Sequence, residues 1–425
     1  MTSEPTPGQD TPRPRVRRAW KRLVLLGAII GPGLITANID NDAGGIATYS
    51  IAGAQFGYAL LWTLIPATVA LIVVQEMAAR MGVATGKGLA ELIRERFGVT
   101  VTFWLMVGLF LTDMGNTTAE FAGWAASLEL FGVSKYVSVP VAAMFVWVLV
   151  VKGTYRMFER VFLMICVVYF TYAIAAFMAK PDWADVTRQL LLPSFRFDSS
   201  YLSMTIGLVG TTIAPWMQFY LQAAIVEKGV TREQYWGSRI DVIAGSFMTD
   251  IVALFIMVVC GATLFPAGIR IDSAEQAAMA LAPLAGKHAS ILFAIGLANA
   301  SLFSACILPL ATAFYICEAM GWEAGVDKTW RQTPEFMSLY TAFIVIGALI
   351  VMIPGMPLIS IMWVSQVING VMLPFVLIFM LILINDQELM RGWTNSRVQN
   401  WVAWSTTLVM MALTLGLCVT AILGS

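Results

Sequence analysis

Long apolar runs, separated by short polar breaks, follow one another along the chain after a polar start. A helix needs about 20 mostly apolar residues to cross the hydrocarbon core of a membrane. Runs near this length predict eleven spanning helices and therefore an all-α membrane protein. Their approximate bounds are 23–53, 57–81, 101–131, 135–151, 160–179, 200–227, 240–265, 288–318, 337–354, 356–385 and 400–423.

Composition agrees with this pattern and excludes other classes of protein. The 425 residues are 59% hydrophobic and only 12% charged, whereas soluble domains carry about 25% charged residues. No nucleophile motif or phosphate-binding loop is present, so we do not expect an enzyme. The formal net charge is zero, which gives no reason to expect a nucleic-acid partner. The predicted partner is the lipid bilayer, no cofactor is expected, and the oligomeric state is left open with a monomer as the default.

Positive charges predict the orientation in the membrane. Residues 1–20 are polar and rich in proline and arginine, and we interpret them as a flexible cytoplasmic tail before a membrane domain over 21–425. Cytoplasmic loops usually carry an excess of Lys and Arg. Loops on the side of the tail are richer in these residues than loops on the opposite side. The sequence therefore predicts a multi-pass plasma-membrane protein with a cytoplasmic N-terminus and an extracellular C-terminus.

Two predicted spans are interrupted at corresponding places, the first over 31–45 and the sixth over 210–216. The first contains Asp, Asn and paired glycines, and in the sixth Pro215 lacks the N–H that would bond the carbonyl near Thr211. Unwound backbone at membrane depth is found only where protein or a cavity surrounds it. Ordinary kinks would explain either break alone, but two breaks five spans apart favour a transporter of inverted repeats. The repeats would cover about 23–179 and 200–385, with an extra helix over about 400–423.

Asp42, inside the first break, is the strongest single signal. A carboxylate at the centre of a bilayer costs about 2.5–3.5 kcal/mol on insertion scales. No predicted span carries a central Lys or Arg to neutralise it, so a transported cation is a natural partner. Carboxylate and carbonyl oxygens suit Mg²⁺, Ca²⁺ or Mn²⁺.

Several motifs resemble the Nramp family of divalent-metal transporters over nearly the whole chain. Residues 75–97 are close to the family pattern Q-x-x-A-x-R-x-G-x-x-T-G-x-x-L-A-E. Shorter matches are Tyr155–Glu159, Gln366–Val367, Leu373–Phe375 and Asn395–Arg397. The resemblance implies a LeuT-type fold of 5+5 inverted repeats, with helices 1 and 6 broken.

The resemblance also implies a metal site at Asp42, Gly45, Thr211, Ala214 and Gln366. The first-helix motif Asp-Pro-Gly-Asn reads Asp-Ala-Gly-Gly here, and the sixth-helix motif Met-Pro-His reads Ala-Pro-Trp. The acid is kept, but the Asn, the Met thioether and the His are absent. Because a thioether favours transition metals over Mg²⁺, we expect import of partly hydrated Mg²⁺, with Mn²⁺ also accepted, as in the magnesium-transporting branch. The alternatives are a proton-coupled Mn²⁺/Fe²⁺ importer and a metal-sensing receptor without flux.

Family members that move protons use acids on the third helix and the sixth-helix His. The alignment that we prefer keeps an acid at Glu120 and places Thr117 where a second acid would lie. The alternative alignment places Asp113 at that second acid and Asn116 at the position of Glu120. Trp216 replaces the His. We treat Glu120, Asp113, Thr117 and Trp216 as candidates for a proton or water pathway, and we expect transport without obligatory proton coupling. Asp250 has no assigned role.

Overall fold

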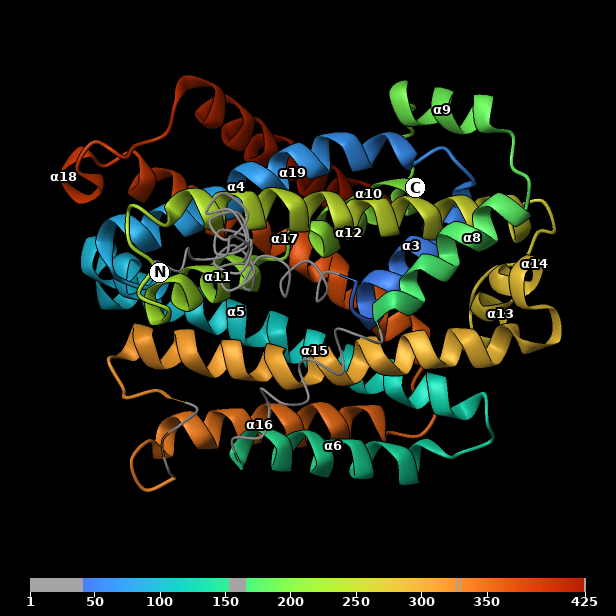
Figure 1. Cartoon of the computed structure of the whole chain (residues 1–425), viewed down its shortest axis with the longest axis horizontal. Coiled ribbons are helices and arrows are strands. Elements are labelled where there is room, and N and C mark those ends of the chain that lie inside the picture. Colours follow the sequence, from blue (N-terminus) through green and yellow to red (C-terminus); the bar gives the residue numbers. More distant parts are fainter. Residues whose placement is uncertain (1–40, 153–165, 326–327, 329, 424–425) are drawn as a thin grey trace, which may run out of the picture.

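A computed structural model describes residues 41–152, 166–325, 328 and 330–423 (Figure 1). Every regular element in this part of the chain is a helix. The α-helices are α3 (Ala43–Phe56), α4 (Leu64–Thr85), α5 (Leu89–Glu129), α6 (Lys135–Val151), α8 (Phe170–Met178), α9 (Trp183–Leu191), α10 (Ser199–Thr212), α11 (Pro215–Glu227), α12 (Tyr235–Thr263), α13 (Ala274–Ala278), α14 (Ala282–Ala285), α15 (Ala289–Met320), α16 (Pro334–Val351), α17 (Leu358–Ile384), α18 (Gln387–Met390) and α19 (Arg397–Leu423). Four 3₁₀ turns complete them: η1 (Leu61–Thr63), η2 (Cys166–Tyr169), η3 (Met279–Leu281) and η4 (Gly286–His288).

Seven helices in the described residues are long and apolar enough to cross a membrane. The four other predicted spans fail this length criterion for separate reasons. The spans 23–53 and 160–179 lie partly outside the described residues, 200–227 is split into two helices, and α6 has 17 residues. The count of eleven therefore stays a prediction, while the all-helical membrane architecture is confirmed.

The predicted break in the sixth span is present. Helix α10 ends at Thr212 and α11 begins at Pro215, with Ile213 and Ala214 between them in non-helical backbone. In the first span, α3 begins at Ala43, directly after Asp42. Residues 43–45 of that predicted break are thus helical, because Asp42 caps the first turn of α3. Residues 31–40 of the break lie outside the described residues, as do the tail 1–20 and the Tyr155–Glu159 motif.

Helix α5 begins at Leu89, well before the predicted start near residue 101. Its first turns carry Arg94, Glu95 and Arg96, so a search for apolar runs passes over them. Gly98 has φ 81°, a conformation that glycine adopts without the steric cost other residues incur, and it separates this polar segment from the membrane-spanning part. The predicted inner loop is therefore helical over 89–97.

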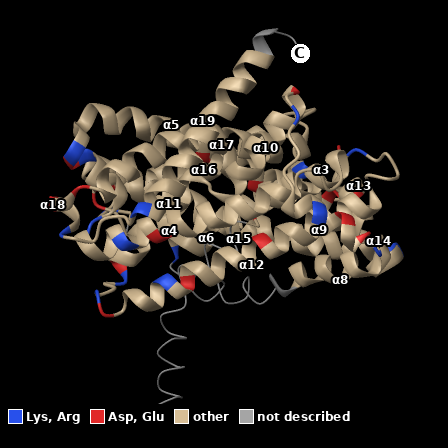
Figure 2. Ribbon diagram, turned by 90° about the horizontal axis from the view of Figure 1, so that it is seen from above, with Lys and Arg blue, Asp and Glu red and all other residues tan. Residues whose placement is uncertain are grey.

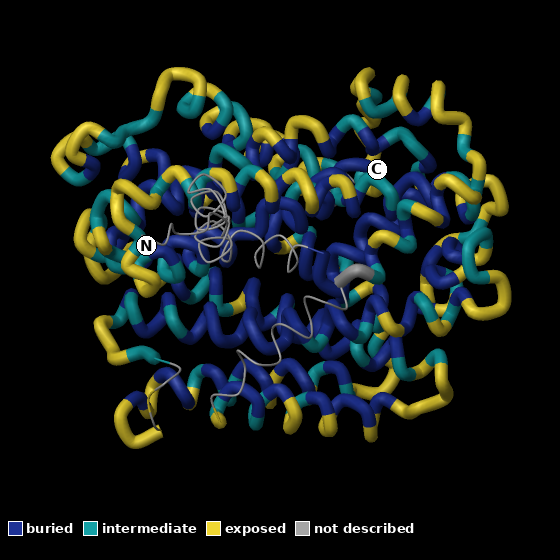
Figure 3. Tube along the Cα trace, in the orientation of Figure 1, coloured by how far each residue is buried: buried dark blue, intermediate teal, exposed yellow. Residues whose placement is uncertain are grey.

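The long helices run along the long axis of the molecule and enclose a buried centre (Figures 1 and 3). Helix α5 packs against α15, α17 and α16, α10 packs against α17, and α12 packs against α3 and α4. Charged side chains gather toward the two ends of this bundle, and its middle is mostly uncharged (Figure 2). This distribution suits a bundle that spans an apolar layer.

Loops predicted on one side of the membrane meet at one end of the bundle. Arg96, at the start of α5, forms an ion pair of 3.2 Å with Asp386 beside α18. Lys135, at the start of α6, donates to the carbonyl of Ile353 after α16 at 2.9 Å. The first pair joins predicted inner loops and the second joins predicted outer loops. Which end faces the cytoplasm stays a prediction.

Candidate metal site at the helix breaks

Asp42 is held at the first turn of α3. It is the N-cap of this helix, and its Oδ1 accepts a hydrogen bond of 2.6 Å from the N–H of Gly45. A helix N-terminus favours negative charge because its N–H groups lack partners within the helix and its dipole is positive there. Gly45, predicted as a site residue, thus contributes an N–H that orients the acid. The Asp42 side chain is buried.

Glu120 of α5 lies at the same helix end. Its Oε2 accepts from the N–H of Ala43 at 3.4 Å, and its carboxyl group lies beside that of Asp42. Its second oxygen, Oε1, is buried without a hydrogen-bond partner among the described residues. No group of three or more His, Cys, Asp or Glu that could hold a metal occurs in the described part of the chain. A cation here would therefore meet two carboxyl groups and neutral oxygens.

The break between α10 and α11 supplies neutral oxygens at Thr211. Its hydroxyl is buried without a partner among the described residues. The residue four positions on is Pro215, which has no N–H to bond the Thr211 carbonyl. Ala214 differs, because its carbonyl already accepts from the N–H of Met217 at 3.2 Å and from Nε2 of Gln218 at 3.4 Å. Its methyl side chain offers no donor atom, so the carbonyl is the only group through which Ala214 could ligate, and its place in the metal site stays a prediction.

Gln366 of α17 faces the start of α3. A Cβ added to Gly44 would collide with the Gln366 side-chain amide, and one added to Gly210 of α10 would collide with the Gln366 backbone carbonyl. The amide oxygen of Gln366 accepts from Nδ2 of Asn369 at 2.8 Å, and its nitrogen lies 3.3 Å from the hydroxyl of Ser365. In this conformation the amide nitrogen, rather than the oxygen, is next to Gly44.

The other predicted pathway residues do not all reach this point. Thr117 lies against Gly347 of α16, and Trp216 is buried with its ring centre 6.1 Å from that of Tyr220. The Thr117 hydroxyl is buried without a hydrogen-bond partner among the described residues. The pathway roles of Thr117 and Trp216 stay predictions. Hydrogen bonds connect Asp113 to Gln366 through two asparagines, Asn116 and Asn369.

Sequence reasoning missed Asn369 as part of this connection. It follows Gln366 by one helical turn in an otherwise apolar segment, and such spacing places both amides on one face. Tyr315 was missed as well; it hydrogen-bonds Asp113 from α15. Tyr315 follows Thr312 by three residues, and Thr312 bonds the same carboxylate. Two hydroxyl residues at this spacing lie on one helix face, which is the sequence signal for Tyr315.

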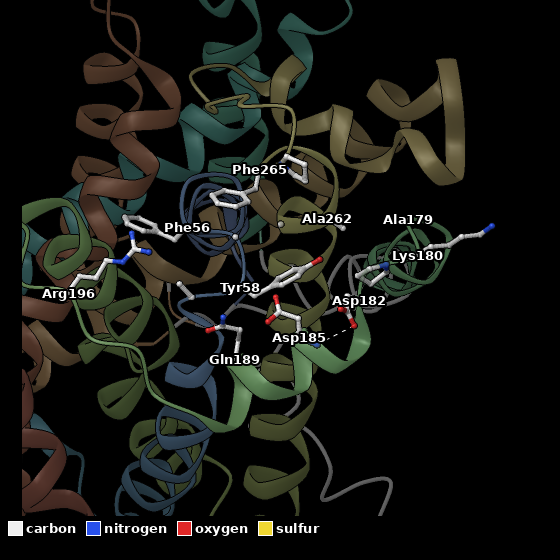
Figure 4. A pocket seen from close by; sticks show the side chains of 15 residues that line it. Phe56, Tyr58, Ala179, Lys180, Asp182, Asp185, Gln189, Arg196, Ala262 and Phe265 are labelled. Carbon is white, nitrogen blue, oxygen red and sulfur yellow. Dashed lines mark hydrogen bonds between the residues drawn. The ribbon is translucent and has the colours of Figure 1, made fainter.

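Away from these residues, a cavity of about 470 Å³ opens where α3, α9 and α12 approach one another (Figure 4). Tyr58, Asp182, Asp185 and Arg196 are among its lining residues. Burial, and secondarily the negative charges of Asp185 and Asp182, raise the pKa of Tyr58. The Asp182 carboxylate caps α9 by accepting from the N–H of Ala184 at 2.9 Å. The cavity is at the predicted outer end of the bundle.

Comparison with known proteins gives consistent matches over the chain. The profile of the Nramp family, described as natural resistance-associated macrophage protein-like, matches residues 33–420. A divalent metal cation transporter MntH of Granulibacter bethesdensis is 28% identical over 416 residues, covering 95% of this chain and 90% of that protein. A protein of the same name from Deinococcus radiodurans is 27% identical over 398 residues, covering 90% of this chain and 88% of that protein.

Solved structures agree on the fold. A manganese transporter of Eremococcus coleocola superposes with a TM-score of 0.77 at 23% identity, covering 95% of this chain and 87% of that one. A nucleobase-cation-symport-1 family transporter superposes with a TM-score of 0.59 at 13% identity, covering 91% of each chain. These neighbours share the LeuT-type fold that the sequence motifs predicted.

Proposed function

The chain belongs to the Nramp family, and on this premise we propose that it carries divalent metal ions across the membrane through the site at Asp42. The relatives named above are metal-ion transporters rather than enzymes. One observation carries the proposal: two carboxyl groups, Asp42 and Glu120, meet at the start of a half-helix. Thr211, at the opposing helix break, and Gln366 are the neutral groups of the proposed site.

For the transported ion, the relatives favour Mn²⁺ over the Mg²⁺ that the sequence motifs predicted. The curated relatives are divalent metal cation transporters of the MntH type, and a structural neighbour is a manganese transporter. None of them supports a magnesium preference. Carboxylate, carbonyl and water oxygens suit Mn²⁺, so the missing thioether at Ala214 does not argue against it.

Mg²⁺ remains a second candidate because of the donor atoms in the site. Ala214 carries a methyl group and its carbonyl is engaged, which leaves oxygen donors from Asp42, Glu120 and Thr211. Mg²⁺ is typically held by one or two carboxylates while it keeps several waters. A site without sulfur lacks the soft ligand that would favour a transition metal.

Flux in liposomes tests the proposal. The full chain should take up Mn²⁺, and a direct comparison with Mg²⁺ and Ca²⁺ decides between the two candidates. Asp42→Ala should abolish uptake, and Asp250→Ala, which removes a buried acid from α12 instead, is the matched control. Metal binding without flux in the wild-type protein would favour a receptor.

Proton movement is measured in the same liposomes with a pH-sensitive dye in the lumen. We expect no obligatory coupling, so the lumen should not acidify in step with metal uptake. Acidification that tracks uptake would support the proton-coupled alternative.

A further inference from the structure

A continuous series of buried side chains joins Asp113 of α5 to Gln366 of α17. Nδ2 of Asn116 donates to Oδ1 of Asp113 at 3.1 Å, and Asn116 and Asn369 exchange two hydrogen bonds of 3.0 Å. Asn369 then donates to Oε1 of Gln366 at 2.8 Å. All four side chains are buried in the bundle.

Asp113 sits at one end of this series as an acceptor. Besides Asn116, the hydroxyl of Tyr315 donates to its Oδ2, and the hydroxyl of Thr312 lies 2.8 Å from the same oxygen. An ionised carboxylate can only accept hydrogen bonds, whereas an amide has one accepting end and one donating end. The neighbours of Asp113 therefore present donors to it.

This requirement fixes the direction of each amide. Asn116 must turn its NH₂ toward Asp113, which leaves its oxygen to accept from Asn369. Asn369 then has its NH₂ directed at both Asn116 and Gln366, so Gln366 must meet it with its oxygen. The NH₂ of Gln366 is left beside Gly44, at the start of α3. An NH₂ group has no lone pair available to ligate a cation.

We propose that Asp113 is a positioning residue that sets which end of the Gln366 amide faces the metal site. With an acceptor at position 113, the nitrogen of Gln366 faces the site. With a donor at that position, both asparagines reverse and the Gln366 oxygen turns toward α3, where it becomes an additional hard ligand. This inference rests on the proposed function, since it assigns Gln366 a role toward the transported ion.

Asp113→Asn is the direct test, because the substituted amide keeps the shape of Asp113 and can donate. Calorimetric titration with Mn²⁺ of the purified full chain should give a Kd lower by about two- to tenfold, the equivalent of one hydrogen bond gained at the site. The gain should vanish when Gln366→Ala is combined with Asp113→Asn. Asp250→Asn makes the same exchange in α12, outside this series, and serves as the control. Its effect on the Kd should be the same whether or not Gln366 is present.

A change in Kd that is the same in the presence and absence of Gln366 would overturn the inference. If Asp113→Asn does not fold, Asn116→Leu interrupts the series between Asp113 and Asn369. The Gln366 amide is then no longer held in one direction by Asp113, and the Kd should fall in the same, Gln366-dependent way. A metal-free measurement separates this inference from the proposed function. The side-chain amide resonance of Gln366, assigned by its loss in Gln366→Ala, should move in Asp113→Asn and stay in place in Asp250→Asn. An unmoved resonance disproves the series of amide reversals even if the wild-type protein binds no Mn²⁺.

Discussion

The carboxyl group of Glu120 lies beside that of Asp42 at the first turn of α3, where the N–H groups of Ala43 and Gly45 bond one acid each. Two acids at one helix end can share a divalent cation, and each has a separate consequence when it is removed. Asp42 also caps the helix, so its charge and its capping role must be tested apart.

Asp42→Asn should abolish Mn²⁺ uptake while leaving the protein folded. Asn is as good an N-cap as Asp, whereas Ala at this position costs about 1 kcal/mol of stability. Uptake in liposomes and the melting temperature in detergent measure the two roles. Wild-type uptake by Asp42→Asn would show that the charge is not needed.

Glu120→Gln should weaken Mn²⁺ binding by about tenfold, since it removes one of the two negative charges next to the ion. Glu129→Gln is the matched control, because it makes the same exchange at the exposed end of α5. Calorimetry on both variants checks this. Equal affinities would place Glu120 outside the metal site.

Ala214→Met should raise Cd²⁺ and Mn²⁺ uptake relative to Mg²⁺, because a thioether favours the softer ions. Ala214 is buried at the helix break, so added bulk alone can alter transport. Ala214→Leu introduces similar bulk without sulfur and serves as the control. If both variants change the uptake ratios alike, position 214 acts through its size.

Gly210→Ala should destabilise the protein by about 1–3 kcal/mol, the usual cost of overpacking. The added methyl would collide with the Gln366 carbonyl and with Gly370. At Gly115 of α5, by contrast, a Cβ would meet the Ser365 side chain at an ordinary 3.8 Å. Gly210→Ala should therefore have a lower melting temperature than Gly115→Ala. Equal melting temperatures would contradict the close approach of α10 and α17.

Asp185→Asn should lower the pKa of Tyr58, because one of the negative charges that raise it is lost. Burial, the larger cause, stays in place, so the pKa should remain above the usual value of about 10. Ultraviolet titration, with Tyr58→Phe subtracted, measures this. An unchanged pKa would show that Asp185 does not act on this phenol.

The sequence predicts those features that depend on neighbours along the chain. Apolar runs locate most long helices, and Pro215 marks the break because the missing N–H is a local property. The sequence also identifies Asp42 as a buried acid. The pairing of Asn116 with Asn369 is different, since it depends on how α5 and α17 pack. The orientation of the Gln366 amide follows from that packing and has no signature in the sequence.

The direct backbone contact of α10 with α17 has a mechanical consequence. Gly210 faces the backbone of α17, and Gly370 faces the backbone and side chain of Ile206. Sliding one helix along the other would bring residues larger than glycine into these close contacts. We therefore expect a rearrangement that opens the site to move the two helices together. Thr211 and Gln366 would then keep their spacing throughout a transport cycle, and the distances that change would be those to Asp42 and Glu120.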